Sequence, residues 1–162
     1  MAKGFADQLK SELENVYNKK TKGFKDAVFE LCSDVIKTTP VDKGDAVSSW
    51  TPSVGVKKTR VIRTGNEPAE DTSTVQTRKN TYVAQKQQEL FAELENWNPL
   101  TESFYFVNTI EYIADLEDGM YSRGVETQKT TAAGFSKQAP AGMVRIHVND
   151  WEQYLKKNNV NN

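Results

Sequence analysis

The sequence offers few residues from which an active site or a metal centre could be built. Cys32 and His147 are the only cysteine and the only histidine among 162 residues. A single cysteine excludes an internal disulfide, which is typical of a protein of the reducing cytoplasm. One thiol and one imidazole cannot supply the usual ligands of a structural zinc site, and the glycines form no phosphate-binding motif. We therefore expect no metal and no cofactor.

A basic excess and a long hydrophobic run are also missing. The chain has 21 Lys and Arg against 22 Asp and Glu, a net charge of -1. Dedicated nucleic-acid binders usually carry a basic excess, because phosphate neutralisation supplies most of their affinity. No apolar run approaches the roughly 20 residues that span a bilayer, and residues 1–10 lack the apolar region of a signal peptide. These features predict a soluble, intracellular, nearly neutral protein.

Neither Cys32 nor His147 has sequence surroundings typical of catalysis. His147 lies in a predicted C-terminal helix beside its apolar stripe, and no serine is set in a nucleophile elbow. Cys32 lies on the apolar stripe of the first helix, where a thiol packs as a small hydrophobic group. We predict that the chain is not an enzyme. The alternative, a hydrolase that uses His147, would be excluded if a His147→Gln variant kept all activity and assembled normally.

The clearest structural pattern covers the first forty residues. Apolar residues recur there every three or four positions and predict one stripe of a long helix; they are Leu9, Leu13, Val16, Tyr17, Phe24, Ala27, Val28, Leu31, Cys32, Val35 and Ile36. Gly23 interrupts the pattern and leaves a break or bend as an alternative to one continuous helix. The helix is expected to end at Thr39, because a residue before proline is driven out of the helical region.

The middle of the chain predicts a mixture of elements. Asp42 is expected to cap a short helical turn that leaves Trp50 partly buried. A strand is expected over residues 56–63, and a polar loop or arm over about 64–80, where Thr, Ser, Gly, Pro and charged residues dominate. A helix is then expected from Tyr82 to Trp97 and ends at the Asn98–Pro99 dipeptide. Its buried face would consist of Val83, Gln87, Leu90, Phe91, Leu94 and Trp97.

The last sixty residues predict a strand, a short helix and a final helix. The strand reads ESFYFVNTI, residues 102–110, and the short helix reads IEYIADLEDG, residues 110–119. The final helix would bury Val144, Val148, Trp151 and Leu155 ahead of a flexible tail over about 157–162. The resulting prediction is one domain, residues 1–162, of the α+β class. A long N-terminal helix and a C-terminal helix would pack on a small antiparallel β-sheet.

Two stretches of backbone are expected to be unusually rigid. Gly119 follows the short helix directly and can take the positive φ of a helix C-terminus. Pro140 fixes its own φ, and Gly142 permits close approach of the backbone just before the final helix. Rigid corners of this kind can hold surfaces in register between identical subunits.

Three motifs together resemble the neck and tail-completion proteins of long-tailed bacteriophages, the group that includes the minor tail protein Z type. They read TPVDKGDAVSSW, EYIADLEDG and APAGMVR, and they occur in the order of that family. The matching positions are Thr39, Pro40, Val41, Asp42, Gly44, Ser49 and Trp50, then Asn108, Tyr112, Ala114, Glu117 and Gly119, and then Ala139, Pro140, Gly142 and Met143. Lys43 departs from the small or polar residue that is common there, and the region before Trp97 is longer than in a minimal member.

The resemblance implies a structural virion protein at the head–tail junction, without catalytic activity. It implies a homo-oligomeric ring, sixfold or twelvefold, between a portal-adaptor or head-closure protein and a tail terminator or tail tube protein. Double-stranded DNA would pass through the channel without sequence-specific contact. The interface candidates are Trp50, Tyr112, Glu117, Gly119, Pro140, Gly142 and Met143. Domain core is the competing interpretation, and the one we favour for Trp50 and Tyr112.

A function of a different class remains open from the residues alone. Basic runs occur at residues 18–25, NKKTKGFK, and 56–63, VKKTRVIR. Either could contact phosphate in a small intracellular nucleic-acid-associated module, although ordinary solvated surface explains such runs more simply in a neutral chain. Tight DNA binding that falls steeply with salt would favour the module over the ring protein.

Overall fold

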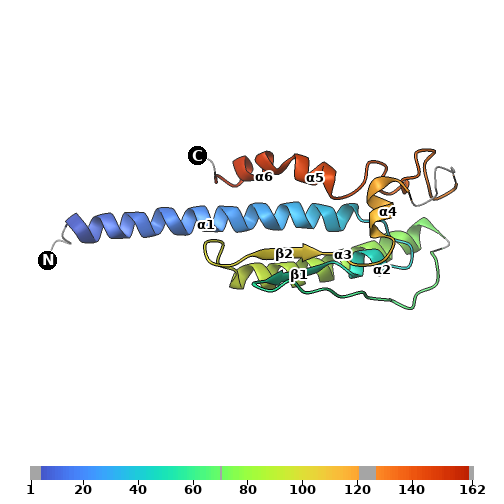
Figure 1. Ribbon diagram of the computed structural model, residues 1–162, viewed down its shortest axis with the longest axis horizontal. Coiled ribbons are helices and arrows are strands. Elements are labelled where there is room, and N and C mark those ends of the chain that lie inside the picture. Colours follow the sequence, from blue (N-terminus) through green and yellow to red (C-terminus); the bar gives the residue numbers. More distant parts are fainter. Residues whose placement is uncertain (1–4, 70, 121–126, 161–162) are drawn as a thin grey trace.

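A single long helix, α1 (Phe5–Thr38), runs through the molecule, and its N-terminal part extends beyond the other helices and strands (Figure 1). The computed structural model describes residues 5–69, 71–120 and 127–160. Along the chain α1 is followed by α2 (Asp45–Ser48), β1 (Thr51–Val54), α3 (Thr72–Asn96), β2 (Phe104–Val107), α4 (Ile113–Asp118), α5 (Arg145–Asn149) and α6 (Trp151–Lys157). The predicted α+β class is confirmed.

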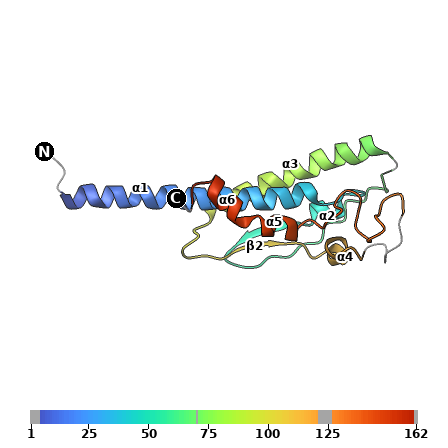
Figure 2. The same ribbon diagram turned by 90° about the horizontal axis from the view of Figure 1, so that it is seen from above.

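The core lies between α1, α3 and a two-stranded sheet. β1 and β2 pair antiparallel with Thr51 opposite Val107. α3 lies along one side of α1, and α5 and α6 pack against α1 away from α3 (Figure 2). The buried side chains at the centre come from α1, α2, α3 and the turns beside them, and the sheet packs against them through the partly buried Val54, Phe104 and Phe106; the central residues are Cys32, Val35, Ile36, Val41, Val47, Trp50, Leu90, Leu94 and Trp97.

The helix α1 is continuous through Gly23, so the expected alternative of a break is wrong. A Cβ atom at Gly23 would overlap the carbonyl oxygen of Asn158. The ammonium group of Lys20 also donates to the carbonyl oxygens of Asn159 and Val160, at 3.1 and 2.9 Å. Gly23 therefore allows the end of the chain to approach α1. The tail predicted to be flexible packs on the helix as far as residue 160, and residues 161–162 lie outside the described part.

Two boundaries predicted for the middle of the chain are wrong. The strand is Thr51–Val54 and not 56–63, because Thr51–Val54 pairs with β2 whereas residues 57–63 lie outside the sheet. Pro52 is tolerated in this strand because both strands of a two-stranded sheet are edge strands. Helix α3 begins at Thr72, inside the predicted polar loop, because the Asp71 carboxylate caps it by accepting from the Thr74 N–H at 2.7 Å.

The predicted C-terminal helix is two short helices joined at Asp150. No described residue of either helix is fully buried, and Val148 is 50% exposed. The predicted stripe is therefore wrong for Val148, while Trp151 does reach the core edge and packs its ring against Phe24. The same holds in α3, where Leu90 and Leu94 are buried but Phe91 is 55% exposed.

Lys86 is a charged residue in the middle of this fold. Its side chain is 1% exposed, and its ammonium lies 2.7 Å from the Glu89 carboxylate, so burial lowers the pKa of Lys86 although Glu89 opposes this. Removing one member of an ion pair is costly when the charge left behind is buried, but Glu89 is 32% exposed and still pairs with Arg60 at 3.3 Å. We expect Lys86→Met to leave the free energy of unfolding unchanged or raise it by about 1 kcal/mol in urea denaturation. Glu89→Gln, which leaves the cation buried without its partner, should lower it by about 2 kcal/mol or more; equal losses in both variants would contradict this account.

Candidate functional site

Three segments that are far apart in the sequence meet at one end of the molecule. They are residues 39–50, 108–119 and 138–145, and we call their meeting point the corner. Ala46, Leu116 and Met143, one from each segment, form a small buried cluster. A cleft of about 300 Å³ opens beside this cluster, between residues 40–46, Tyr112, Leu116 and Gln138. The three motifs of the sequence resemblance thus share one core.

Glu117 joins the second segment to the third. Its carboxylate accepts hydrogen bonds from the backbone N–H groups of Met143, Val144 and Arg145, at 2.7, 2.8 and 2.9 Å. The Arg145 guanidinium in turn donates to the Glu117 carbonyl at 3.0 Å. These N–H groups stand at the start of α5 and have no partner within the helix, so Glu117 acts as a cap supplied by another segment.

Gly142 permits this arrangement. Its φ is +83°, a left-handed conformation, and a Cβ atom there would lie 2.8 Å from the Glu117 carbonyl oxygen. Gly119 has a φ of +75° and ends α4, with the Met120 N–H donating back to Asp115. The predicted helix terminus at Gly119 is confirmed. A Cβ atom on Gly119 would lie 2.7 Å from the Phe135 ring, so this glycine is required by packing as well as by φ.

Two amide side chains join the first segment to the others. The Gln138 side chain accepts from the Val41 N–H at 2.9 Å and donates to the Val41 carbonyl at 2.8 Å. The Asn108 side chain donates to the Ala46 carbonyl at 2.7 Å and accepts from the Ile110 N–H at 3.1 Å. The resemblance pointed to Asn108, whereas Gln138 lies just outside its motif and carries no sequence signal.

The aromatic and sulfur-containing interface candidates lie mainly inside the chain. Trp50 is 5% exposed and stacks on Phe106 at 4.6 Å between ring centroids, and its indole N–H donates to Thr39 at 2.9 Å. Met143 is fully buried. Tyr112 is half-buried, and Pro140 is exposed. Any contribution of Trp50 and Met143 to an interface is therefore indirect, whereas Pro140 and Tyr112 reach the surface of the corner.

The predicted helix cap at Asp42 is wrong. Helix α2 begins after Gly44, which has a φ of +102° and offers no side-chain cap. Asp42 instead accepts from the Ala69 N–H at 2.8 Å and lies 3.0 Å from the Lys129 ammonium. The Asp42 carboxylate therefore binds the loop at Ala69 and does not cap helix α2.

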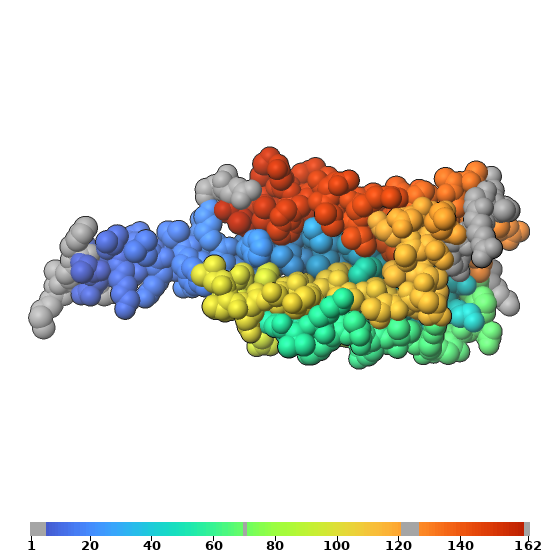
Figure 3. Space-filling model, viewed as in Figure 1, coloured from blue at the N-terminus to red at the C-terminus, as the bar shows by residue number. Residues whose placement is uncertain are grey.

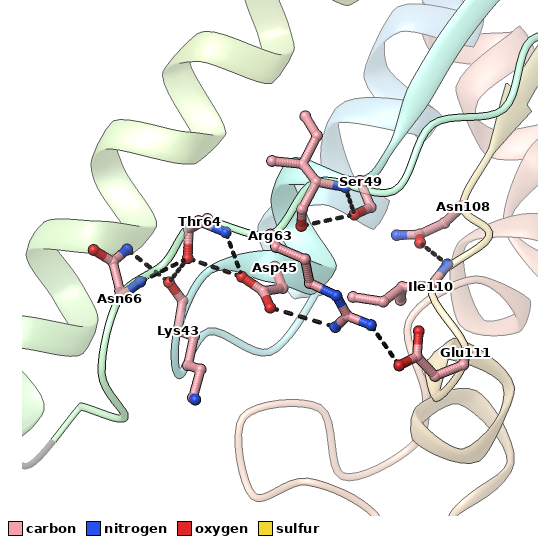
Figure 4. A network of polar contacts seen from close by, with 10 residues as sticks. Lys43, Asp45, Ser49, Arg63, Thr64, Asn66, Asn108, Ile110 and Glu111 are labelled. Atoms are coloured by element: carbon pink, nitrogen blue, oxygen red, sulfur yellow. Dashed lines mark hydrogen bonds and ion pairs between the residues drawn. The ribbon is translucent and has the colours of Figure 1, made fainter.

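Asp45 is the centre of a polar network that the sequence did not reveal (Figure 4). Its carboxylate accepts from the N–H and the hydroxyl of Thr64, both at 2.8 Å, and lies 3.5 Å from the Arg63 guanidinium, which also pairs with Glu111. The Ser49 hydroxyl oxygen accepts a hydrogen bond from the Ile62 N–H at 2.9 Å. These contacts fasten the extended segment 62–66 along α2.

The Asp45 network predicts a loss of stability in acid. Burial by itself would raise the pKa of Asp45, but the hydrogen bonds from Thr64 and the Arg63 cation outweigh it and hold this pKa below its usual range. A carboxyl whose folded-state pKa is lowered contributes stability above its unfolded pKa of about 4, and this is lost as pH falls through the lower folded-state value. We expect Asp45→Asn to lower the free energy of unfolding at pH 7 by about 1–2 kcal/mol. Urea titrations from pH 7 to pH 3 should show the difference from wild type shrinking; a constant difference would contradict the assignment.

His147 and Cys32 both make contacts inside the chain. The His147 ring nitrogens lie 2.7 Å from the Thr38 hydroxyl and 3.3 Å from the Tyr154 hydroxyl, and Tyr154 donates to Asp34 at 2.9 Å. This chain of contacts fixes α5 and α6 on α1. Cys32 is 3% exposed, which confirms the prediction that it packs as a small hydrophobic group, and burial raises its pKa to about 12. Within the described residues, no group of three or more His, Cys, Asp and Glu could hold a metal ion.

The two basic runs are largely engaged within the chain. Lys22 pairs with Asp26 at 2.6 Å, and Lys25 donates to the Glu95 carbonyl at 3.1 Å. In the second run Arg60 lies 3.3 Å from Glu89, and Arg63 binds two acids. Acidic partners beside each run reduce the positive potential that a phosphate backbone would meet.

Comparisons of the chain with known protein families, with curated proteins and with solved structures found no match. The likeness to neck and tail-completion proteins therefore depends on the three motifs alone. Among the helices of the described residues, none has the length and apolar character needed to cross a membrane.

Proposed function

We propose that this chain is a structural subunit of the bacteriophage head–tail junction, a neck or tail-completion protein that assembles as a ring. The observation that carries the proposal is the corner: the three segments that carry the motifs, which resemble that family only as an ordered set, share one core and bond to one another. If the likeness of these short motifs were due to chance, there would be no reason for them to meet in one core. The ring would join the portal or head-closure assembly to the tail and leave the DNA channel free of specific contacts.

The polar contacts of the corner suit a subunit that must keep its shape in an assembly. Glu117, Gln138 and Asn108 each bind backbone groups of a different segment, so the corner is fixed by main-chain contacts rather than by side-chain packing alone. Ring closure requires a fixed rotation between neighbours, and a rigid surface at the contact sets that rotation. Among the interface candidates, Pro140 is exposed and Tyr112 and Glu117 are half-buried, so a neighbour could touch them.

The proposal is tested by the assembly state and by the position in the particle. Native mass spectrometry and negative-stain imaging of the purified chain should show closed rings, alone or after addition of a head-closure or tail protein of the same virus. An antibody against the chain should label virus particles where capsid and tail meet. Label confined to another part of the particle, or turnover of a substrate by the purified chain, would rule the proposal out.

A further inference from the structure

The N-terminal part of α1 is an arm on whose apolar stripe no other described element packs. Residues 5–17 protrude beyond the other elements in the space-filling view (Figure 3). Four apolar side chains at helical spacing, which we call the arm stripe, stay exposed: Leu9 at 48%, Leu13 at 62%, Val16 at 55% and Tyr17 at 41%. Further along the same helix the corresponding positions are buried in the core, at Ala27 and Val35. A contiguous apolar stripe on a protruding helix marks an interaction surface.

A second apolar surface lies where α1 and α3 run side by side. A groove of about 630 Å³ is lined there by Lys22, Lys25, Phe29, Phe91 and Leu94 among others. Phe91 is 55% exposed and meets Phe29 edge to face at 6.3 Å between centroids. This groove therefore has an aromatic floor, and its lining carries two acids, Asp26 and Glu95, as well as the two lysines.

The two surfaces lie on roughly opposite sides of α1. Successive residues of an α-helix turn by about 100°, which places the groove positions 22, 25 and 29 roughly half a turn from the stripe positions 9, 13 and 16. Two different patches on opposite sides of one subunit join copies head to tail, and such contacts close into a ring when the rotation between copies allows it.

The arm and the part of α1 beside the groove also differ in charge. Residues 7–14 contain three acids and one base, whereas residues 18–25 contain four lysines and no acid. Asp26 and Glu95 at the groove offset part of this positive charge, and the balance leaves the arm net negative and the groove region net positive, which favours their association.

An arm paired with a second arm is the competing arrangement, and the chain itself obstructs it. An antiparallel second arm centred on the stripe would continue over Lys20 and Gly23. Residues 158–160 of the same chain already pack there, against Gly23 and on the Lys20 ammonium.

We infer that the arm of one subunit docks in the α1–α3 groove of the next copy of this chain. The arm stripe then covers Phe91 and Phe29, and the net-negative arm lies beside the lysine-rich residues 18–25. This inference rests on the proposed function, because it supplies the contact that repeats around the ring. Each subunit contributes one arm and receives one, so a closed ring leaves no arm stripe exposed.

Cysteine cross-linking tests the inference in the full-length protein. Leu13→Cys and Phe91→Cys chains are purified separately, mixed and treated with a bis-maleimide, while the buried Cys32 stays protected in both. Both changed positions are exposed, and circular dichroism verifies that each variant folds. We expect cross-links between the two variants, and far fewer when Leu100→Cys, at a position 74% exposed, replaces Phe91→Cys. Leu13→Asp should weaken self-association about tenfold or more, because it places a charge in an apolar contact.

The outcomes separate the inference from the proposed function. Cross-links of Leu13→Cys to itself would show paired arms and overturn the inference, as would a mixed yield no higher than the Leu100→Cys control. Closed rings without mixed cross-links would retain the ring protein and remove the arm contact. Mixed cross-links in open chains that never close would support the arm contact and remove the ring.

Discussion

Glu117→Ala should lower the free energy of unfolding by about 2–4 kcal/mol. The change removes a charged acceptor and leaves the backbone N–H groups of Met143 and Val144 without the oxygen that they bind at 2.7 and 2.8 Å. Met143 is fully buried, so its N–H has little access to water as a substitute. A buried donor deprived of its partner costs more than an exposed hydrogen bond yields. Urea denaturation followed by tryptophan fluorescence gives the loss directly.

Two further variants show whether the carboxylate acts through these contacts. Asp118→Ala removes the neighbouring acid, whose side chain is 64% exposed and lies 3.9 Å from Arg145, and should change stability by less than about 0.5 kcal/mol. Glu117→Gln keeps one acceptor oxygen and should fall between wild type and alanine. Hydrogen exchange should accelerate at residues 143–145 in Glu117→Ala. Unchanged exchange there, whatever the global stability, would disprove the role of Glu117 as a cap.

The same variant also bears on the proposed function. If the corner presents a surface to neighbouring subunits, loosening residues 140–145 should reduce the yield of rings even at a temperature where the variant is fully folded. A variant that folds less stably yet assembles as well as wild type would mean that the corner supports the fold alone. The arm contact would be unaffected by that result, because the arm lies at the other end of α1.

The fold class and the helix termini with local signals could be predicted from the sequence. Pro40 ends α1, Gly119 ends α4, and the apolar pattern before Thr39 defines the long helix. Each of these depends on residues within a turn of the feature. The α1 stripe shows the limit of this reasoning, because Leu13 and Val35 obey the same spacing. Only the tertiary structure shows that the first is exposed and the second buried.

What could not be predicted depends on contacts between distant segments. Gly23 reads as a helix interruption, but its function is set by Asn158, which lies 135 positions away along the chain. From the sequence, Asp45 is simply an acid in the first turn of a short helix, but its contacts with Thr64 and Arg63 make it the centre of a hydrogen-bond network. Gln138 carries no local signal at all, although it binds both backbone groups of Val41. Side chains that bind the backbone of a remote segment leave no periodicity from which they could be identified.

Trp50→Ala should be the most damaging single change in the core, with a loss of about 3–5 kcal/mol in the free energy of unfolding. The indole is 5% exposed and stacks on Phe106 with an interplanar angle of 6°. Its removal would leave a cavity between α1 and the sheet and would free the Thr39 hydroxyl, which also donates to the Val35 carbonyl at 2.8 Å. Because the Trp50 indole donates a hydrogen bond to Thr39 at the end of α1, its loss should also loosen the corner segment 39–50.

Trp50→Phe separates the stack from the hydrogen bond. Phenylalanine keeps an aromatic ring against Phe106 but cannot donate to Thr39, so we expect a loss of about 1–2 kcal/mol, well short of the alanine variant. Thermal unfolding by circular dichroism at fixed pH ranks the three proteins. If Trp50 acted mainly as a contact to another subunit, the isolated chain would lose little stability in either variant while ring assembly failed in both. A large loss in the isolated chain, graded from phenylalanine to alanine, means that the motif residue Trp50 serves the assembly by holding α1 and the sheet in place.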